Sequence, residues 1–274
     1  MRKVAIVGVG LIGGSFGLAL RKAGFPGEVV GVSSDRTIEK AVACGAVDRG
    51  MALEEAAGWA DLVFLAQPIY GIIETLEKLM PVLGRNTLVT DAGSTKRAIT
   101  EAAARFVPRD LFLGGHPMAG GEKRGVEAGR ADLFAGRRWV LDVNTANHDH
   151  PTARVFRKWI QAFGAQEVIM DAATHDRLVA WASHLPQLAS TALASAIQDS
   201  MPQAQQVAGP GVMDMTRLAM SSWDLWNDIL ETNSGEVAAA LDAYIAKLQD
   251  MRQDMAREFA NGSAFAKNLR GENT

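Results

Sequence analysis

Residues 4–15 read VAIVGVGLIGGS, a short apolar run that leads into a glycine pattern, GxGxxG, and then into a helix-like segment. In this strand–turn–helix setting each glycine has a separate task. Gly8 permits the tight turn, Gly10 lets the backbone approach a pyrophosphate, and Gly13 lets the helix and the strand pack closely. The stretch therefore predicts a dinucleotide-binding βαβ unit.

The start of the predicted helix adds to this anion site. The first N–H groups of a helix have no partner inside the helix, and the helix dipole places a partial positive charge beside them, next to Leu11 and Ile12 in the turn. We therefore expect Leu11 and Ile12 to bind the cofactor together with the three glycines.

Outward from this turn, strand-like and helix-like segments alternate as far as residue 171, which indicates a parallel sheet covered by helices. The pattern predicts further strands over 28–33, 62–66, 88–90, 111–114, 139–143 and 167–170, and helices over 14–23, 37–44, 70–80 and 96–106. We expect the later strands to extend the same sheet.

After residue 171 the strand signals vanish. Helical segments are predicted over 174–181, 188–200, 223–232 and 236–259, the last with amphipathic spacing. The fold class is therefore α/β: residues 1–171 form a Rossmann-type doubly wound parallel sheet, and residues 172–274 form a helical domain. Helices that hide their apolar faces poorly alone indicate a homodimer, and a monomer with these helices packed on the first domain is the alternative.

The composition is that of a soluble globular protein, with 48% hydrophobic and 22% charged residues. A net charge of -3 argues against a protein specialised for nucleic acid or for a membrane surface. Cys44 is the single cysteine, which excludes an intramolecular disulfide and favours a reducing compartment, so we expect a cytoplasmic protein. The charge-free stretch 178–198 has the length of a membrane helix, but it contains His184 and Pro186, which favours a buried helix.

The end of the second predicted strand selects the dinucleotide. An acidic residue there would bind the ribose 2′-hydroxyl of NAD and repel the 2′-phosphate of NADP. Ser33 stands at this position, and Ser33, Ser34 and Arg36 together would make a phosphate pocket. We therefore favour NADP, with NAD as the alternative if Asp35 turns inward.

Two polar loops follow later strands, at the sheet edge where doubly wound folds bind ligands. The first reads DAGSTK (91–96), where Ser94 is a candidate for the chemistry and Ser94 or Thr95 a candidate helix N-cap. The second reads HPMAGGEK (116–123). A histidine at a strand end, beside a nicotinamide site, suits a general base, so we predict that His116 is catalytic.

The helical half carries polar groups in apolar surroundings. His175 begins one predicted helix, Ser183 and His184 lie eight and nine residues on, and Arg217 follows a glycine-proline loop. Such buried groups need partners, either an anionic small-molecule substrate or each other. The histidine and glutamate spacings match no metal signature, so we predict no metal.

Taken together, these segments resemble the prephenate/arogenate (cyclohexadienyl) dehydrogenases of tyrosine biosynthesis. The matching pieces, in the order of the family, are VGVGLIGGS at 7–15, DAGSTK at 91–96, GGHPMAG at 114–120, HDRLVAWASHLPQL at 175–188 and DMTRLA at 214–219. The resemblance implies NAD(P)-dependent oxidative decarboxylation. Hydride leaves the ring carbon that bears the hydroxyl, the ring carboxylate departs as CO2, and the ring becomes aromatic.

The resemblance also implies roles for single residues. His116 matches the histidine that accepts the hydroxyl proton, Ser94 a serine that hydrogen-bonds the reacting region, and Arg217 the arginine that holds a substrate carboxylate. Residues that match positions at the mouth or floor of the substrate pocket are Glu122, His175, Ser183 and His184. The second domain of the family is helical and forms a dimer.

Three positions depart from the family pattern: Met213 stands where many relatives have a cation, Gln187 where some have a second histidine, and Gly121 where a threonine is common. Loss of a cation near the substrate side chain weakens the case for prephenate, whose side chain is an anion, more than for arogenate, whose side chain is a zwitterion. We therefore expect a preference for arogenate.

Two other functions fit parts of the pattern. One is another two-domain dehydrogenase of the β-hydroxyacid or imine type, but lysine-using members place a lysine in the interdomain helix, and this chain has none between Lys158 and Lys247. The other is a protein that binds NAD(P) without turnover, against which the set of His116, Ser94 and Arg217 argues.

Overall fold

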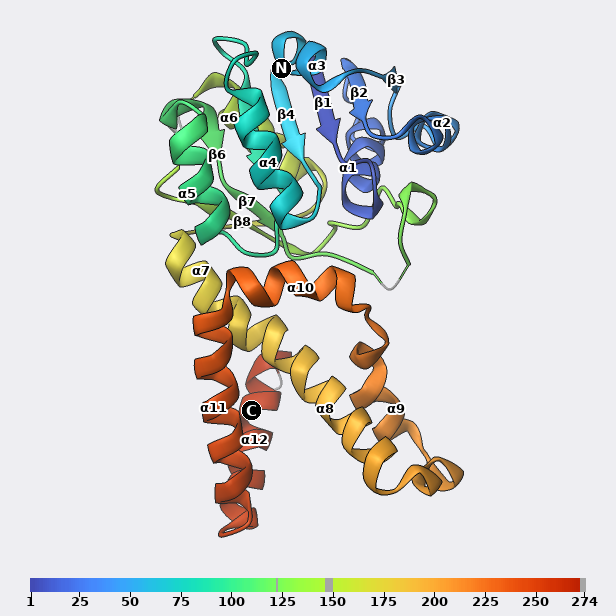
Figure 1. Cartoon of the computed structure of the whole chain (residues 1–274), viewed down its shortest axis with the longest axis vertical. Coiled ribbons are helices and arrows are strands. Elements are labelled where there is room, and N and C mark those ends of the chain that lie inside the picture. Colours follow the sequence, from blue (N-terminus) through green and yellow to red (C-terminus); the bar gives the residue numbers. More distant parts are fainter. Residues whose placement is uncertain (122, 146–149, 272–274) are drawn as a thin grey trace. The chain divides into compact units, whose positions relative to one another are not determined.

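The computed structural model describes residues 1–121, 123–145 and 150–271 (Figure 1). By their internal contacts the residues divide into two compact units. Unit 1 comprises residues 1–179 and 220–232, and unit 2 comprises residues 180–219 and the chain from 233 onward.

Unit 1 is built on a six-stranded parallel sheet with the strand order β3-β2-β1-β4-β5-β6. The strands are β1 (Lys3–Val7), β2 (Glu28–Val32), β3 (Arg49–Gly50), β4 (Leu62–Leu65), β5 (Leu88–Asp91) and β6 (Phe112–Leu113). This is the order of a Rossmann fold, with the switch point beside β1, where such sheets bind their ligands. The expected fold class is confirmed.

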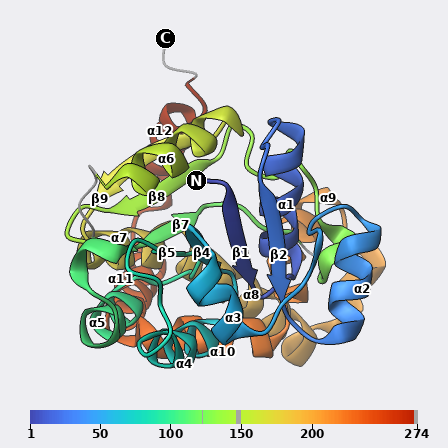
Figure 2. The same cartoon turned by 90° about the horizontal axis from the view of Figure 1, so that it is seen from above.

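Helices cover both faces of this sheet (Figure 2). Successive residues of a strand point to opposite faces, so Ile6 of β1 joins one hydrophobic core and its neighbour Ala5 joins the other. The helices that contribute to the first core are α1 (Leu11–Lys22), α2 (Asp35–Ala43) and α6 (Pro151–Ala162). Those that contribute to the second are α3 (Leu53–Trp59), α4 (Ile69–Leu79) and α5 (Arg97–Phe106).

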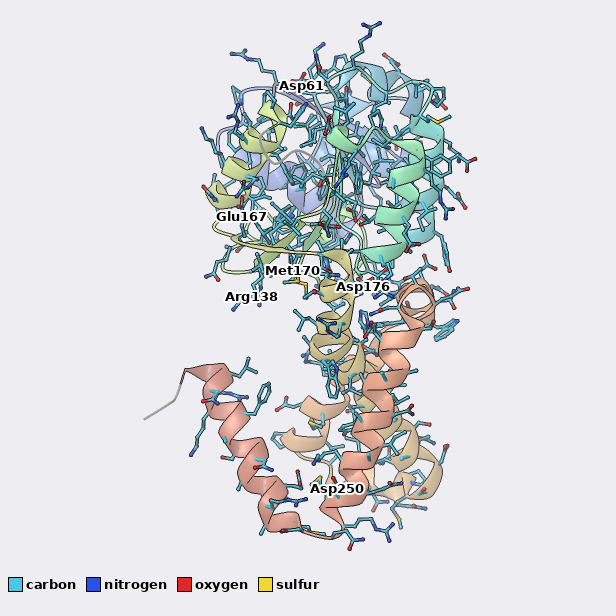
Figure 3. All side chains as sticks on the ribbon, turned by 90° about the vertical axis from the view of Figure 1, so that its left-hand side faces the viewer. Asp61, Arg138, Glu167, Met170, Asp176 and Asp250 are labelled. Carbon is cyan, nitrogen blue, oxygen red and sulfur yellow. The ribbon has the colours of Figure 1, made fainter. Side chains whose placement is uncertain are left out.

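The later strands form a separate sheet with the order β7-β8-β9. They are β7 (Gly115–Pro117), β8 (Arg138–Asp142) and β9 (Gln166–Met170), and Figure 3 labels residues of β8 and β9. The prediction that the strands over 139–143 and 167–170 extend the first sheet is wrong, whereas the one over 111–114 does so as β6. β7 runs antiparallel to β8, and just before β7 the carbonyl of Gly114 accepts the N–H of Asp142 at 2.9 Å. An apolar run does not specify which strand it pairs with, so the sequence pattern could not separate the two sheets.

Two helices from the second half of the chain belong to unit 1. α7 (Ala172–Val179) contacts α5, and α10 (Trp223–Thr232) packs against α4. The cause is apolar burial: Ile229 of α10 is 6% exposed and lies in the second core. The division by contacts therefore does not coincide with the boundary expected near residue 171.

Unit 2 is helical. A π-helical turn (Ala180–His184) leads into α8 (Leu185–Ser200), which contacts α9 (Pro210–Thr216) and α11 (Ser234–Met251). The single helix predicted over 236–259 is wrong in extent, since α11 ends at Met251 and α12 (Met255–Arg270) begins after it. Asp254 breaks the helix, because its side chain caps α12 by accepting the N–H of Arg257 at 3.0 Å. In the described part of the chain, no helix combines the length and apolar character that a membrane crossing needs.

Candidate active site

The glycine turn between β1 and α1 has the geometry that its sequence predicts. Gly8 has a φ of +88°, a conformation that favours glycine, and its N–H donates to the carbonyl of Val32 on β2 at 3.0 Å. A Cβ on Gly13 would lie 2.2 Å from the carbonyl oxygen of Gly8, so only glycine fits there. A Cβ on Gly10 would meet nothing within 4 Å, which leaves the backbone at the start of α1 open to a ligand.

A pocket of about 330 Å³ opens beside this turn. Its lining joins the glycine turn to the end of β2, to α2 and to two other loops of unit 1: Gly8, Val9, Gly10, Ser33, Thr37, Lys40, Ala66, Gln67, Pro68, Gly125, Val126 and Glu127. Exposed backbone at a helix N-terminus, with hydroxyl groups and an ammonium group further along, fits the phosphates and ribose of a dinucleotide. The residues present therefore fit the cofactor class that the sequence predicts.

The predicted cofactor residues divide between this pocket and its surroundings. Ser33 lines the pocket, whereas Ser34 is the residue before α2, with its hydroxyl 3.0 Å from that of Thr37, and Arg36 is exposed on α2. Sequence reasoning missed Thr37 and Lys40, although residues three apart share one face of a helix and this spacing could have revealed them.

Glu127 lies beside this part of the pocket. It belongs to a short 3-10 turn (Val126–Ala128) that contacts α1 and α2, and its carboxylate lies 2.5 Å from Nζ of Lys40. The cation that lines this pocket, Lys40, thus already has an anionic partner from the protein. No periodicity in the sequence around Glu127 indicated this position.

The second loop group is organised by the carboxylate of Asp91, the fully buried last residue of β5. It accepts the N–H groups of Gly93 and Gly115, each at 2.9 Å, and it pairs with the buried ammonium group of Lys96. Gly115 immediately precedes His116, so Asp91 connects the 91–96 loop to the strand that carries His116.

The side chain of His116 continues into a chain of hydrogen bonds. Its Nδ1 lies 2.9 Å from Nε2 of His175, and Nδ1 of His175 lies 2.8 Å from Oδ1 of Asp176. The two carboxylate oxygens of Asp176 accept the N–H groups of Lys96 and Arg97 at 2.7 and 2.9 Å. Figure 3 labels Asp176, which lies on α7. His175 and Asp176 are each 1% exposed, whereas His116 is half-buried and can reach a ligand.

The bonds to Asp176 favour its ionised form. Burial alone would raise the pKa of the Asp176 carboxyl, but the hydrogen bonds from His175, Arg97 and Lys96 outweigh burial and hold that pKa below its usual range. The charge also lies at the N-terminus of α5, where a helix dipole stabilises an anion.

Ser94 lies half-buried on the loop between β5 and α5. Gly93 is fixed to Asp91 and Lys96 to Asp176, so both sides of Ser94 are anchored to the groups that hold His116. The expectation that Ser94 or Thr95 caps α5 is wrong. Lys96 occupies the N-cap position without a side-chain cap, and Asp176, far away in sequence, accepts the N–H groups there.

The remaining predicted substrate residues that are described belong to unit 2. Ser183 and His184 lie in the π-helical turn, a feature found often at functional sites. His184 is 1% exposed, with Nδ1 at 3.3 Å from the side-chain amide of Asn233, and Arg217 is exposed at the end of α9. Glu122 lies outside the described residues.

Comparison with known proteins identifies the family. Residues 16–169 match the model of the prephenate dehydrogenase nucleotide-binding domain, and residues 171–270 match the model of the prephenate dehydrogenase dimerization domain. The chain belongs to the prephenate dehydrogenase family. The resemblance inferred from the sequence motifs is thus confirmed: the chain belongs to this family of oxidoreductases rather than to the β-hydroxyacid or imine-type dehydrogenases.

Solved structures of this family share the whole fold. A prephenate dehydrogenase from Aquifex aeolicus, in complex with hydroxyphenyl propionate and NAD+, is 29% identical with a TM-score of 0.87, and the match covers 99% of this chain and 97% of that one. An arogenate dehydrogenase from Synechocystis is 31% identical with a TM-score of 0.80, and the match covers 98% of both chains. A prephenate dehydrogenase from Lactococcus lactis is 32% identical over 85% of this chain, which spans 65% of that relative's length.

Proposed function

We propose that this chain catalyses the NAD(P)-dependent oxidative decarboxylation of arogenate or prephenate, giving tyrosine or 4-hydroxyphenylpyruvate. The observation that carries the proposal is the accessible His116, connected through His175 to a buried carboxylate, in a chain matched by both prephenate dehydrogenase models. When bound, the nicotinamide supplies the hydride acceptor.

The residues of the chain orient the substrate and accept one proton from it. We assign His116 as the base that accepts the proton of the ring hydroxyl at Nε2, the ring nitrogen that does not face His175. Ser94 hydrogen-bonds the reacting region, and Arg217 holds a substrate carboxylate through its two-pronged guanidinium group. Residues proposed to complete the substrate site are Glu122, Ser183 and His184.

The same proposal assigns the dinucleotide to residues 1–171 and the substrate and dimer contacts to residues 172–274. The backbone at Gly8, Gly10, Leu11 and Ile12 would hold the pyrophosphate, with Gly13 packed beneath the turn.

We further propose that NADP is the preferred dinucleotide. Neutral Ser33 and Thr37 and cationic Lys40 line the ribose end of the pocket, and Asp35, the alternative acidic residue, is exposed at the start of α2 and absent from the lining. Glu127 opposes this preference, since it neutralises Lys40 and would repel a 2′-phosphate. The preference for NADP thus depends on Lys40 exchanging one anion for another.

For the substrate, we propose a preference for arogenate. Met213 on α9 is 66% exposed and offers no charge at a position where many relatives have a cation. The anionic side chain of prephenate would gain no ion pair at this position. The zwitterionic side chain of arogenate loses less binding energy when the cation is missing.

We also propose that the chain forms a homodimer through its helical region. Large apolar side chains of unit 2 are exposed on α9, α11 and α12: Met213, Met215, Ile245, Leu248, Met255, Phe259, Phe265 and Leu269. Apolar surface of this extent marks an interaction site, which agrees with the dimerization-domain match. The cytoplasmic location stays a prediction from the sequence.

One assay tests substrate and cofactor together: arogenate or prephenate, each with NAD or NADP, followed by the absorbance of the reduced nicotinamide. We expect the highest kcat/KM with arogenate and NADP. A preference for prephenate and NAD would keep the reaction and reject both refinements. Folded protein that binds a nucleotide but turns over neither substrate would reject the proposed activity in favour of a non-catalytic NAD(P)-binding protein.

A further inference from the structure

We propose that Asp176, acting through His175, is a positioning residue that fixes the tautomer of His116, with the proton on Nδ1 and the unshared pair on Nε2. The proposal rests on the proposed role of His116 as the base, and it specifies which nitrogen of that base is ready to accept a proton.

The direction of the hydrogen bonds follows from the chemistry of the groups. An ionised carboxylate can only accept, so Nδ1 of His175 must donate to Asp176. A neutral imidazole has one N–H, so Nε2 of His175 is then an acceptor. Its partner, Nδ1 of His116, must therefore donate. The only proton of a neutral His116 is thereby placed on Nδ1, and Nε2 keeps its unshared pair.

The Asp176 carboxylate, which begins this series of hydrogen bonds, is itself held by further hydrogen bonds. Asp176 accepts two backbone N–H groups at the start of α5, and its side chain and that of His175 are each 1% exposed. The rings of His116 and His175 meet edge to face, with centroids 5.1 Å apart and planes 72° apart, so the bond between them lies along one imidazole edge. Rotation of either ring would break the hydrogen bond between them.

The consequence for the reaction is a base that is oriented before the substrate arrives. When Nε2 of His116 accepts the hydroxyl proton, His116 becomes an imidazolium. No proton needs to move on to His175 or Asp176. The positive charge then lies two hydrogen bonds from the Asp176 carboxylate, which stabilises it. An isolated histidine would spend part of its time with the proton on Nε2, where it cannot accept another.

The tautomer can be measured directly on the full-length wild-type chain, without substrate. Two-bond proton–nitrogen correlation spectra of the 15N-labelled protein distinguish imidazoles protonated at Nδ1 from those protonated at Nε2, and the His116→Asn variant assigns the His116 signals among those of the five histidines. We expect the Nδ1-protonated form of neutral His116. The Nε2-protonated form would overturn the proposal, because it would mean that His175 donates to His116.

A variant then tests the role of Asp176. In Asp176→Asn the amide can donate to Nδ1 of His175, which reverses both hydrogen bonds and moves the proton of His116 to Nε2. We expect kcat to fall by about 10²-fold or more, with dinucleotide affinity unchanged. The matched control is Asp171→Asn. Asp171 precedes α7, the helix that carries Asp176, and accepts the N–H and hydroxyl of Thr174 at 2.8 Å, and its side chain has no described bond to His175.

The outcomes separate this proposal from the proposed function. A slow Asp176→Asn enzyme with an unchanged His116 tautomer, or an Asp171→Asn enzyme that loses as much activity, would reject the positioning role and leave the function intact. An Nδ1-protonated His116 in a wild-type chain without turnover would reject the function and leave the geometry intact. If Asp176→Asn does not fold, the wild-type spectrum still decides the tautomer.

Discussion

The N–H of Gly115 donates to the carboxylate of Asp91 at 2.9 Å, which fixes the residue before His116 to the last residue of β5. Because β5 belongs to the six-stranded sheet and β7 to the three-stranded one, this bond connects the two sheets next to the proposed base. The orientation of His116 thus depends on a carboxylate that does not touch its side chain.

The buried pair of Asp91 and Lys96 should matter greatly for stability. In Lys96→Met the Asp91 charge stays buried without its cation, so we expect the free energy of unfolding to fall by about 3–5 kcal/mol. Urea unfolding followed by circular dichroism measures the change. Lys247→Met is the control, because the Lys247 side chain is 51% exposed and water screens its ion pairs, so the change should have a far smaller effect. Equal losses in the two variants would contradict the importance assigned to burial.

Replacement of the proposed base should slow the reaction without unfolding the protein. In His116→Asn we expect kcat to fall by about 10²-fold or more, the usual scale for a lost acid–base group, with dinucleotide affinity retained. The control is His150→Asn, since His150 lies at the N-terminus of α6 and accepts the N–H of Thr152. An unchanged kcat in His116→Asn would remove His116 from the mechanism.

Arg217 should act on substrate binding more than on the chemical step. A charged hydrogen bond contributes about 1.5–3 kcal/mol, so Arg217→Ala should raise KM by roughly 10-fold or more with a smaller effect on kcat. The exposed Arg252, which follows α11, supplies the control variant Arg252→Ala. A normal KM in Arg217→Ala would place the substrate carboxylate elsewhere.

Lys40 and Glu127 should change dinucleotide affinity in opposite directions. Lys40→Gln removes the cation at the ribose end and should weaken NADPH binding by about 10-fold, with little effect on NADH. Glu127→Gln frees Lys40 from its partner and should strengthen NADPH binding relative to NADH. Fluorescence titration of each reduced dinucleotide measures both Kd values without substrate. Variants that change NADH and NADPH binding equally would show that this ion pair lies away from the 2′-phosphate.

Asp176 and Asp142 should give opposite pH dependences of stability. The pKa of Asp176 is lowered on folding, so its contribution is present above the unfolded pKa of about 3.9 and is lost as the pH falls through the lower folded value. Burial raises the pKa of Asp142, so relative to Asp142→Asn the wild type should gain stability as the pH falls through that raised value. Urea unfolding of both Asn variants from pH 7 to about pH 3 compares the two slopes, and slopes of equal sign would contradict the assignment.

Short-range sequence patterns predicted the elements that depend on interactions between neighbouring residues. The alternation of apolar and polar segments located most strands and helices of unit 1, and Gly8 and Gly13 are glycines for the steric reasons that the motif implies. Interactions between distant residues were not predictable in this way. Asp176 caps α5 across 80 positions, and β7 pairs with β8 although its three residues give no strand signal. The elements β3, α3 and α9 were not predicted because each is short, whereas α6 was missed although its 12 residues bury an amphipathic face with Phe156 and Ile160.

The residues of the candidate site likewise divide into those that the sequence could indicate and those that only the structure reveals. His116 and Ser94 could be chosen from residue type and loop position, and the family match depends on those motifs. Lys40 and Glu127 could be paired only in three dimensions, because 87 positions separate them and neither lies in the glycine motif. Sequence could likewise identify His175 as polar and buried, but not the hydrogen bond that connects it to His116.

The placement of α10 in unit 1 makes both units discontinuous along the chain. The polypeptide passes between them at 179/180, at 219/220 and at 232/233, so a cut at the first or the last point divides one unit between two fragments, and a cut at 219/220 divides both. A truncated gene encoding residues 1–171 would omit Ile229 and uncover the apolar side of α4 that this residue protects. Such a fragment should be prone to aggregate, whereas one that retains α10 through an engineered loop should stay in solution. Exchange of the first or second half of the gene between relatives would meet the same difficulty. Residues 172–274 contribute to both units, so the exchanged segment does not correspond to one folded unit.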